Sequence, residues 1–163
     1  MKKALLMFAI VTLGLFLAGS AFAQATATQN VTLAVNAVYR ITTSGDPAPL
    51  TITTGTAGSD NLTPVTDNST TYSITQNFGN TVKITAGLTT PLASGYILQI
   101  NLASTRGTSL GNTDISNGTA VNVVTAINRG ADPTKMITYT FSALASSGVM
   151  PPTANVVTLT LTN

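Results

Sequence analysis

The sequence V-T-L-A-V-N-A-V-Y-R-I, residues 31–41, has an apolar residue at every second position. Side chains two apart on a β-strand point to the same side, so these positions form one apolar face. The alternation therefore predicts a strand from Val31 to Ile41, longer than the usual five or six residues. Such a strand either bends from one sheet of a sandwich into the other or extends beyond its own domain to pair elsewhere.

Residues 1–23 have the features of a secretory signal peptide. Two lysines follow Met1, an apolar run extends from Ala4 to Ala18, and Ala-Phe-Ala stands at 21–23. The run is shorter than the roughly 20 residues that span a bilayer, so we expect cleavage after Ala23 rather than a membrane anchor. We therefore expect a signal peptide at 1–23, a single domain at 24–163, and no stable membrane insertion after signal removal.

The remaining charges are few and balanced. Residues 24–163 hold five Lys or Arg and five Asp, with no Glu, His or Cys. Nucleic-acid binding depends on clustered basic residues, so the absence of a basic cluster argues against it. The lack of cysteine excludes disulfides. A nearly neutral surface gives little electrostatic protection against self-association.

The pattern after residue 24 is all-β. Seven to nine alternating segments are separated by turn signals, and no stretch has a helical period. This is typical of an antiparallel β-sandwich, and we expect an immunoglobulin-like one. Two segments rich in turn residues, 54–70 and 105–118, are expected to be loops. The residues expected to be buried between two sheets are Val31, Leu33, Val35, Tyr72, Ile74, Ile84, Leu98, Ile100, Val123, Tyr139, Phe141, Leu159 and Leu161.

Catalytic chemistry has few candidates in this sequence. Without His, Cys or Glu, the usual general base, the thiolate nucleophile and most zinc sites are missing. A nucleophilic serine would depend on Lys83 or Lys135, and alternation places Lys83 on the face opposite its apolar neighbours. We therefore expect no enzyme and no cofactor.

Calcium is the remaining metal to weigh, because it needs only oxygen ligands. Asp60, Asp67 and Asp114 each lie close to an asparagine. Each also stands in a turn-forming context, which explains these residues without a metal. We expect no metal site.

Several strand segments resemble a group of uncharacterised secreted bacterial β-sandwich proteins. These segments are 38–52, 70–75, 83–86, 137–143 and 156–160. The resemblance implies export from a bacterial cell and names no activity. A weaker resemblance, to pilin and spore-coat subunits, rests on architecture alone. Chaperone-assisted subunits of that kind lack a strand and often carry a disulfide, whereas this chain ends in a good strand and has no cysteine.

Together these features favour a non-enzymatic structural or assembly subunit, secreted or at the bacterial cell surface, that forms homo-oligomers or polymers through strand edges. The residues expected to pair with a neighbour are Val31, Leu33 and Val35. The competing hypothesis is that they form the first strand of their own sandwich. An alternative function is a secreted binding module for carbohydrate or a surface partner, using the 54–70 and 105–118 loops.

Overall fold

The computed structural model describes residues 25–79 and 81–163 of the chain. The expected signal peptide, at 1–23, lies outside the described residues. The described chain falls into two units, residues 25–35 and Asn36–Asn163. Within the described residues, no helix has the length and apolar character needed to cross a membrane.

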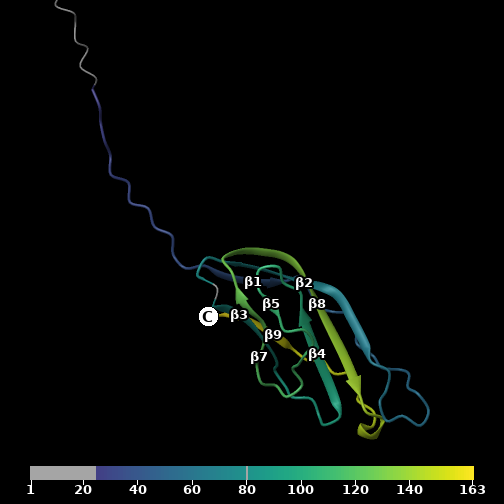
Figure 1. The fold of residues 1–163 in the computed structure, drawn as a ribbon. Coiled ribbons are helices and arrows are strands. Elements are labelled where there is room, and N and C mark those ends of the chain that lie inside the picture. The colour runs from purple at the N-terminus through teal and green to yellow at the C-terminus, as the bar shows by residue number, and fades with distance from the viewer. Residues whose placement is uncertain (1–24, 80) are drawn as a thin grey trace, which may run out of the picture. The chain divides into compact units, whose positions relative to one another are not determined.

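Residues 36–163 form two antiparallel sheets, as the alternating pattern predicted (Figure 1). The five-stranded sheet has the order β1-β2-β8-β4-β6, and the four-stranded sheet has the order β5-β7-β3-β9. A single 3₁₀ turn, η1 (Ala145–Ser147), follows β8. The strands are β1 (Tyr39–Thr43), β2 (Val65–Gln76), β3 (Val82–Leu88), β4 (Tyr96–Leu102), β5 (Thr108–Ser109), β6 (Thr113–Asp114), β7 (Val121–Ile127), β8 (Gly130–Ala143) and β9 (Val157–Thr162).

The core lies between the two sheets and is built from the inward positions of the alternating strands. In β4, for example, Leu98, Ile100 and Leu102 are buried while the residues between them are not. Seven of the expected core residues are buried: Tyr72, Ile74, Ile84, Leu98, Ile100, Val123 and Tyr139. Phe141, Leu159 and Leu161 were expected to be buried but are only partly covered.

The predicted strand from Val31 to Ile41 is wrong in its extent. The strand β1 begins only at Tyr39, which lies opposite Gln76, the last residue of β2. Because β2 ends there, it offers no edge to the residues before Tyr39. Val31, Leu33 and Val35, expected in the core, are instead 73%, 86% and 88% exposed.

The two predicted loops are partly ordered as strands. The 54–70 segment contains the first six residues of β2, although its sequence there is mostly polar. Pairing with β8 holds this part of the chain extended, so tertiary context outweighs local composition. The 105–118 segment contains β5 and β6, and its Ile115 is fully buried, which the sequence analysis missed.

The strand order does not confirm the expected immunoglobulin-like connectivity. An immunoglobulin sandwich has strands A, B, E and D in one sheet and C, F and G in the other. If the two-residue strands β5 and β6 are set aside, the seven others give A-B-F-D and E-C-G. Compared with an immunoglobulin sandwich, strands E (β7) and F (β8) have therefore exchanged sheets. As a result, β8 is the partner of both β2 and β4.

Candidate functional site

The segment 25–35 is the most unusual surface feature of the chain. It has no regular secondary structure, and all its residues are exposed. It contains no charged residue and no proline, so it lacks two of the devices that keep exposed extended segments from pairing with other chains. Its three larger apolar residues, Val31, Leu33 and Val35, alternate with small or polar ones. They are the predicted strand-pairing residues, and none of them pairs with a strand among the described residues.

Asn77 fixes the place where the chain enters the sandwich. Its Oδ1 accepts a hydrogen bond from the Val38 N–H at 2.7 Å, and its Nδ2 donates to the Asn36 carbonyl at 2.8 Å. The ring of Tyr39 then packs on that of Phe78, with centroids 5.7 Å apart. Residues 36–39 are therefore held against the turn that follows β2.

A groove of about 900 Å³ opens on the Asn36–Asn163 unit. One wall is formed by the end of β1 and the chain that follows it, from Thr42 to Leu50, and the other by the chain around Met150 and the start of β9. Most of the side chains between these walls are apolar: Leu92, Leu98, Ile137, Phe141, Val157 and Leu159. Asp46 is the one charged residue that lines the groove among those described.

The groove explains why part of the expected core is incompletely covered. Phe141, Val157 and Leu159 pack against the buried cluster but remain only partly buried, and all three line the groove. Phe141 also stacks on Tyr96, with ring centroids 6.4 Å apart. The sequence pattern correctly identified the inward face of these strands, but the two sheets do not close over it here.

The strand β9 borders the groove with an unpaired edge. It pairs with β3 on one side, from Leu88↔Val157 to Lys83↔Thr162. Among the described residues, no strand pairs with its other side. An edge of this kind presents a row of free backbone N–H and C=O groups, which is a template for an added strand.

The groove also contains a titratable group, Tyr139. Burial raises the pKa of the Tyr139 phenol, and the negative charges of Asp46 and Asp67 raise it further. This side chain is therefore neutral throughout the physiological range, and Asp46 is the charged residue at the groove among those described.

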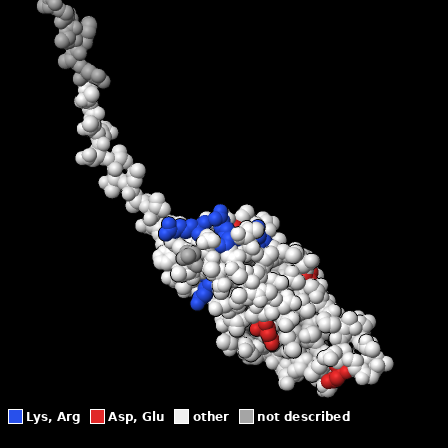
Figure 2. Space-filling view, viewed as in Figure 1, with Lys and Arg blue, Asp and Glu red and all other residues white. Residues whose placement is uncertain are grey.

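Charges are separated between the two ends of the sandwich (Figure 2). The basic end, where β1 and β3 begin, holds Arg40, Lys83, Arg106 and Arg129. The acidic end, where β8 ends and β2, β4 and β9 begin, holds Asp46, Asp60 and Asp67. Asp67 lies opposite Tyr139 on β8, and Asp60 bonds Ser146 just beyond β8. Among the described residues, the one ion pair joins Lys135 and Asp132.

Asp132 is the most heavily bonded charged group of the described residues. Its buried carboxylate accepts hydrogen bonds from the Ser104 hydroxyl (2.8 Å), the Thr105 hydroxyl (2.6 Å) and the backbone N–H groups of Thr105 and Arg106. Burial alone would raise its pKa, but these hydrogen bonds and Lys135 outweigh that effect and lower the pKa of Asp132 to about 2.

The Asp132 cluster has a clear structural role. Ser104, Asp132 and Lys135 resemble parts of a catalytic set, but a carboxylate with such a low pKa is a weak general base. It holds the loop that follows β4 against β8. Nothing in the sequence predicted this role, because the bonded residues lie 27 and 28 positions earlier in the chain.

The candidate calcium ligands are not brought together. The carboxylate of Asp60 bonds Ser146, that of Asp67 bonds Ser69, and that of Asp114 bonds Ser116. No cluster of three or more His, Cys, Asp or Glu occurs in the described parts of the chain. Lys83, which the sequence offered as a possible base for a nucleophilic serine, is partly exposed on β3 opposite Thr162.

The 54–70 and 105–118 segments have no aromatic residue on which a sugar ring would stack.

Comparison of the chain with family models, curated proteins and solved structures gives no match. The resemblance to secreted bacterial β-sandwich proteins therefore stays a prediction.

Proposed function

We propose that this protein is a non-enzymatic extracellular structural subunit that assembles through its N-terminal segment. The observation that carries the proposal is the exposure of Val31, Leu33 and Val35 in an uncharged segment whose apolar residues alternate with strand period. In an assembly, this segment adds a strand to a neighbouring copy and places these three side chains in the neighbour's core.

Exposure of these three apolar side chains to water has a free-energy cost that burial in a neighbour removes. Fully burying a valine or leucine side chain contributes about 1.5 to 3 kcal/mol, so the three residues together represent roughly 5 to 9 kcal/mol of gross stabilisation. Part of this is offset by ordering the segment and by the lost freedom of the bound copy. The backbone hydrogen bonds of an added strand supply further affinity, while the three side chains supply the register.

The cellular setting belongs to the same proposal. Residues 1–23 act as a cleaved signal peptide, and the exported bacterial protein begins at Gln24. Assembly takes place outside the cell, at the surface or in a filament. Mass spectrometry of exported material tests the processing step, and retention of residues 1–23 in most of the protein contradicts it.

The assembly step is tested by two matched variants of the full exported chain. Leu33→Thr introduces a β-branched residue that a strand accommodates well but removes an apolar side chain from the pairing face. Ala34→Thr introduces the same residue at the next position, on the opposite face. We expect wild type and Ala34→Thr to form larger species as concentration rises in light-scattering measurements, and Leu33→Thr to remain monomeric.

Two results contradict the proposal. A wild-type protein that stays monomeric at every concentration shows that no assembly takes place. Equal behaviour of Leu33→Thr and Ala34→Thr shows that the alternating face of the segment is not what pairs. Both substitutions lie outside residues 36–163, so we expect the sandwich to fold in each variant. Circular dichroism of each variant checks this.

A further inference from the structure

We infer that the acceptor for the N-terminal segment is the apolar groove between β9 and the Thr42–Leu50 chain of a second copy, and that copies join head to tail. The inference rests on the proposed function and adds to it the place, direction and polarity of the contact. Its three supports are the chemistry of the groove, the free edge of β9 and the separation of charge between the two ends.

The groove and the segment match in polarity. Between the groove walls lie mostly apolar side chains, three of which, Phe141, Val157 and Leu159, pack on the core without being fully covered. The segment offers three apolar side chains on one face and no charge between residues 24 and 39. Insertion of this face therefore covers the incompletely buried side of the core without burying an unpaired charge.

The edge of β9 supplies the backbone partner. Its six residues, Val157–Thr162, match residues 30–35 in length. No described strand is hydrogen-bonded to its outer side, although β1 lies close to part of β9. An inserted segment becomes the fifth strand of the β5-β7-β3-β9 sheet. Its alternate side chains then point into the groove, and the others point to solvent, as the Thr32 and Ala34 positions require.

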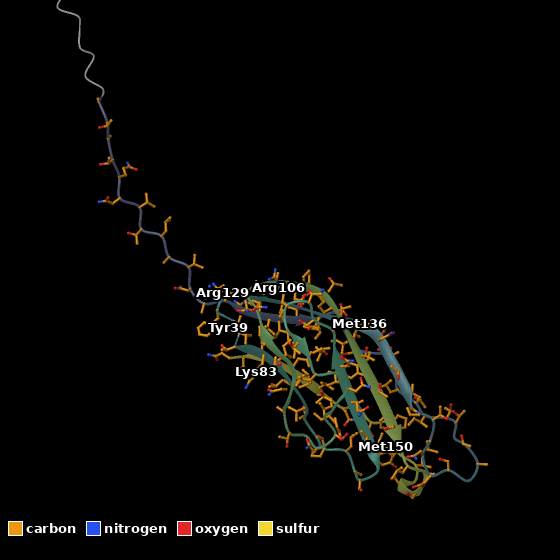
Figure 3. All side chains as sticks on the ribbon, in the orientation of Figure 1. Tyr39, Lys83, Arg106, Arg129, Met136 and Met150 are labelled. Atoms are coloured by element: carbon orange, nitrogen blue, oxygen red, sulfur yellow. The ribbon has the colours of Figure 1, made fainter. Side chains whose placement is uncertain are left out.

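The position of the groove and that of Asn36, to which the segment is joined, favour a head-to-tail contact. The chain enters the sandwich at the basic end, where Asn77 holds Asn36 and Val38. The groove lies toward the acidic end, because Phe141 is opposite Val65 at the start of β2 and Val157 is the first residue of β9. In Figure 3, Tyr39, Lys83, Arg106 and Arg129 are at one end and Met150, which lines the groove, is at the other.

This arrangement also fixes the direction of the added strand. The last residue of the segment, Val35, stays near the acidic end of the acceptor, because it leads into the donor's own sandwich. The first residues of the segment reach toward the acceptor's basic end. Since β9 runs from the acidic end to the basic end, the added strand is antiparallel to it, the same relation that β9 has with β3.

Charge complementarity favours the same contact. Head-to-tail joining brings Arg40, Lys83 and Arg129 of one copy toward Asp46, Asp60 and Asp67 of the next. Such charges steer association and select orientation more than they add affinity, and salt screens them over about 10 Å at 0.1 M. Because donor and acceptor are different surfaces on each copy, the contact repeats and produces a chain of subunits unless the rotation closes a ring.

The absence of cysteine in the sequence makes disulfide trapping a direct test. Two full-length single variants, Leu33→Cys and Leu159→Cys, are mixed and oxidised under assembly conditions. We expect a disulfide-linked heterodimer, because a disulfide forms only where the two Cβ atoms come within about 3.5 to 4.5 Å. The control replaces Leu159→Cys with Thr160→Cys, whose exposed side chain lies on the opposite face of β9. This control mixture is expected to give no cross-link above background.

A second acceptor variant, Met150→Cys, is mixed with Leu33→Cys in the same way. Met150 lies in the groove wall outside β9, so this variant still reports on the groove if Leu159→Cys weakens the strand. The inference is wrong if neither groove variant cross-links above the Thr160→Cys control. In that case, loss of assembly in Leu33→Thr still supports the proposed function and requires a different acceptor. The inference is also wrong if a Leu33→Cys/Leu159→Cys double variant, diluted before oxidation, gives only a monomer with an internal disulfide.

Discussion

Replacing Asp132 with asparagine tests the strongest polar cluster of the sandwich. The substitution keeps the size of the side chain but removes its charge and replaces one acceptor oxygen with a donor NH₂ group. Every neighbour of the Asp132 carboxylate described above donates to it, so the amide can bond only the Ser104 or Thr105 hydroxyl, and only if that hydroxyl turns from donor to acceptor. The variant therefore loses hydrogen bonds from Ser104 or Thr105 and its ion pair with Lys135.

The expected loss of stability follows from the pKa. Folding lowers the pKa of Asp132 from 3.8 to about 2, and each unit corresponds to about 1.4 kcal/mol, so ionisation alone contributes roughly 2 kcal/mol at neutral pH. Unmade hydrogen bonds at a buried site add to this loss. We expect Asp132→Asn to lower the free energy of unfolding by about 2 to 4 kcal/mol at pH 7.

The pH dependence gives the sharper test. Because the folded-state pKa is depressed, the contribution of Asp132 is fully present above about pH 4 and disappears as the pH falls from about 4 toward 2. Urea unfolding of wild type and variant at several pH values should therefore show two stabilities that converge in acid. The control, Asp114→Asn, removes an exposed carboxylate that bonds only Ser116 nearby, and we expect a much smaller change.

Two outcomes refute this reasoning. A loss below about 1 kcal/mol at pH 7 shows that the hydrogen bonds to Asp132 contribute little. A difference between wild type and Asp132→Asn that stays constant between pH 5 and pH 2.5 shows that the carboxylate does not titrate as the structure requires.

Gly107→Ala is expected to destabilise the protein by about 1 to 3 kcal/mol in thermal melts, because the new methyl carbon lies 2.7 Å from a side-chain carbon of Ile127 and 2.8 Å from a backbone oxygen. Gly79→Ala is the control, because its new methyl carbon meets nothing within 4 Å. Thr70→Val should leave stability unchanged or raise it by up to about 1 kcal/mol in urea unfolding, because the buried Thr70 hydroxyl has no hydrogen-bond partner; a clear loss contradicts this. In monomeric protein, Ile100→Ala should cost about 2 to 5 kcal/mol and Phe141→Ala less than Ile100→Ala, because the groove leaves Phe141 partly exposed; the reverse order in denaturant titrations indicates a closed groove.

The sequence predicted the inward faces of the strands well, because alternation is a local property. Tyr72 and Ile74 on β2, and Leu98 and Ile100 on β4, are buried as the pattern required. The same pattern misplaced Val31, Leu33 and Val35. Alternation identifies a segment suited to a strand, but pairing also needs an edge, and β2 provides none beyond Gln76.

The candidate site depends on features that local sequence does not carry. The groove exists because β9 is an edge strand of one sheet while β1 is a short edge strand of the other. Likewise, Asp132 stands directly before Pro133, a local context typical of a turn, although its partners come from the distant loop after β4. Both features follow from strand order, which a periodic pattern does not specify.

The central position of β8 has a consequence for folding kinetics. Because this strand, Gly130–Ala143, pairs with both β2 and β4, neither ladder closes until most of the chain is present. Folding dominated by such distant pairings is slow, in the millisecond-to-second range, since loop closure comes before the stabilising contacts form. If the chain is exported N-terminus first, as proposed above, it therefore stays unfolded until β8 follows, and the strand order itself delays folding until translocation is nearly complete.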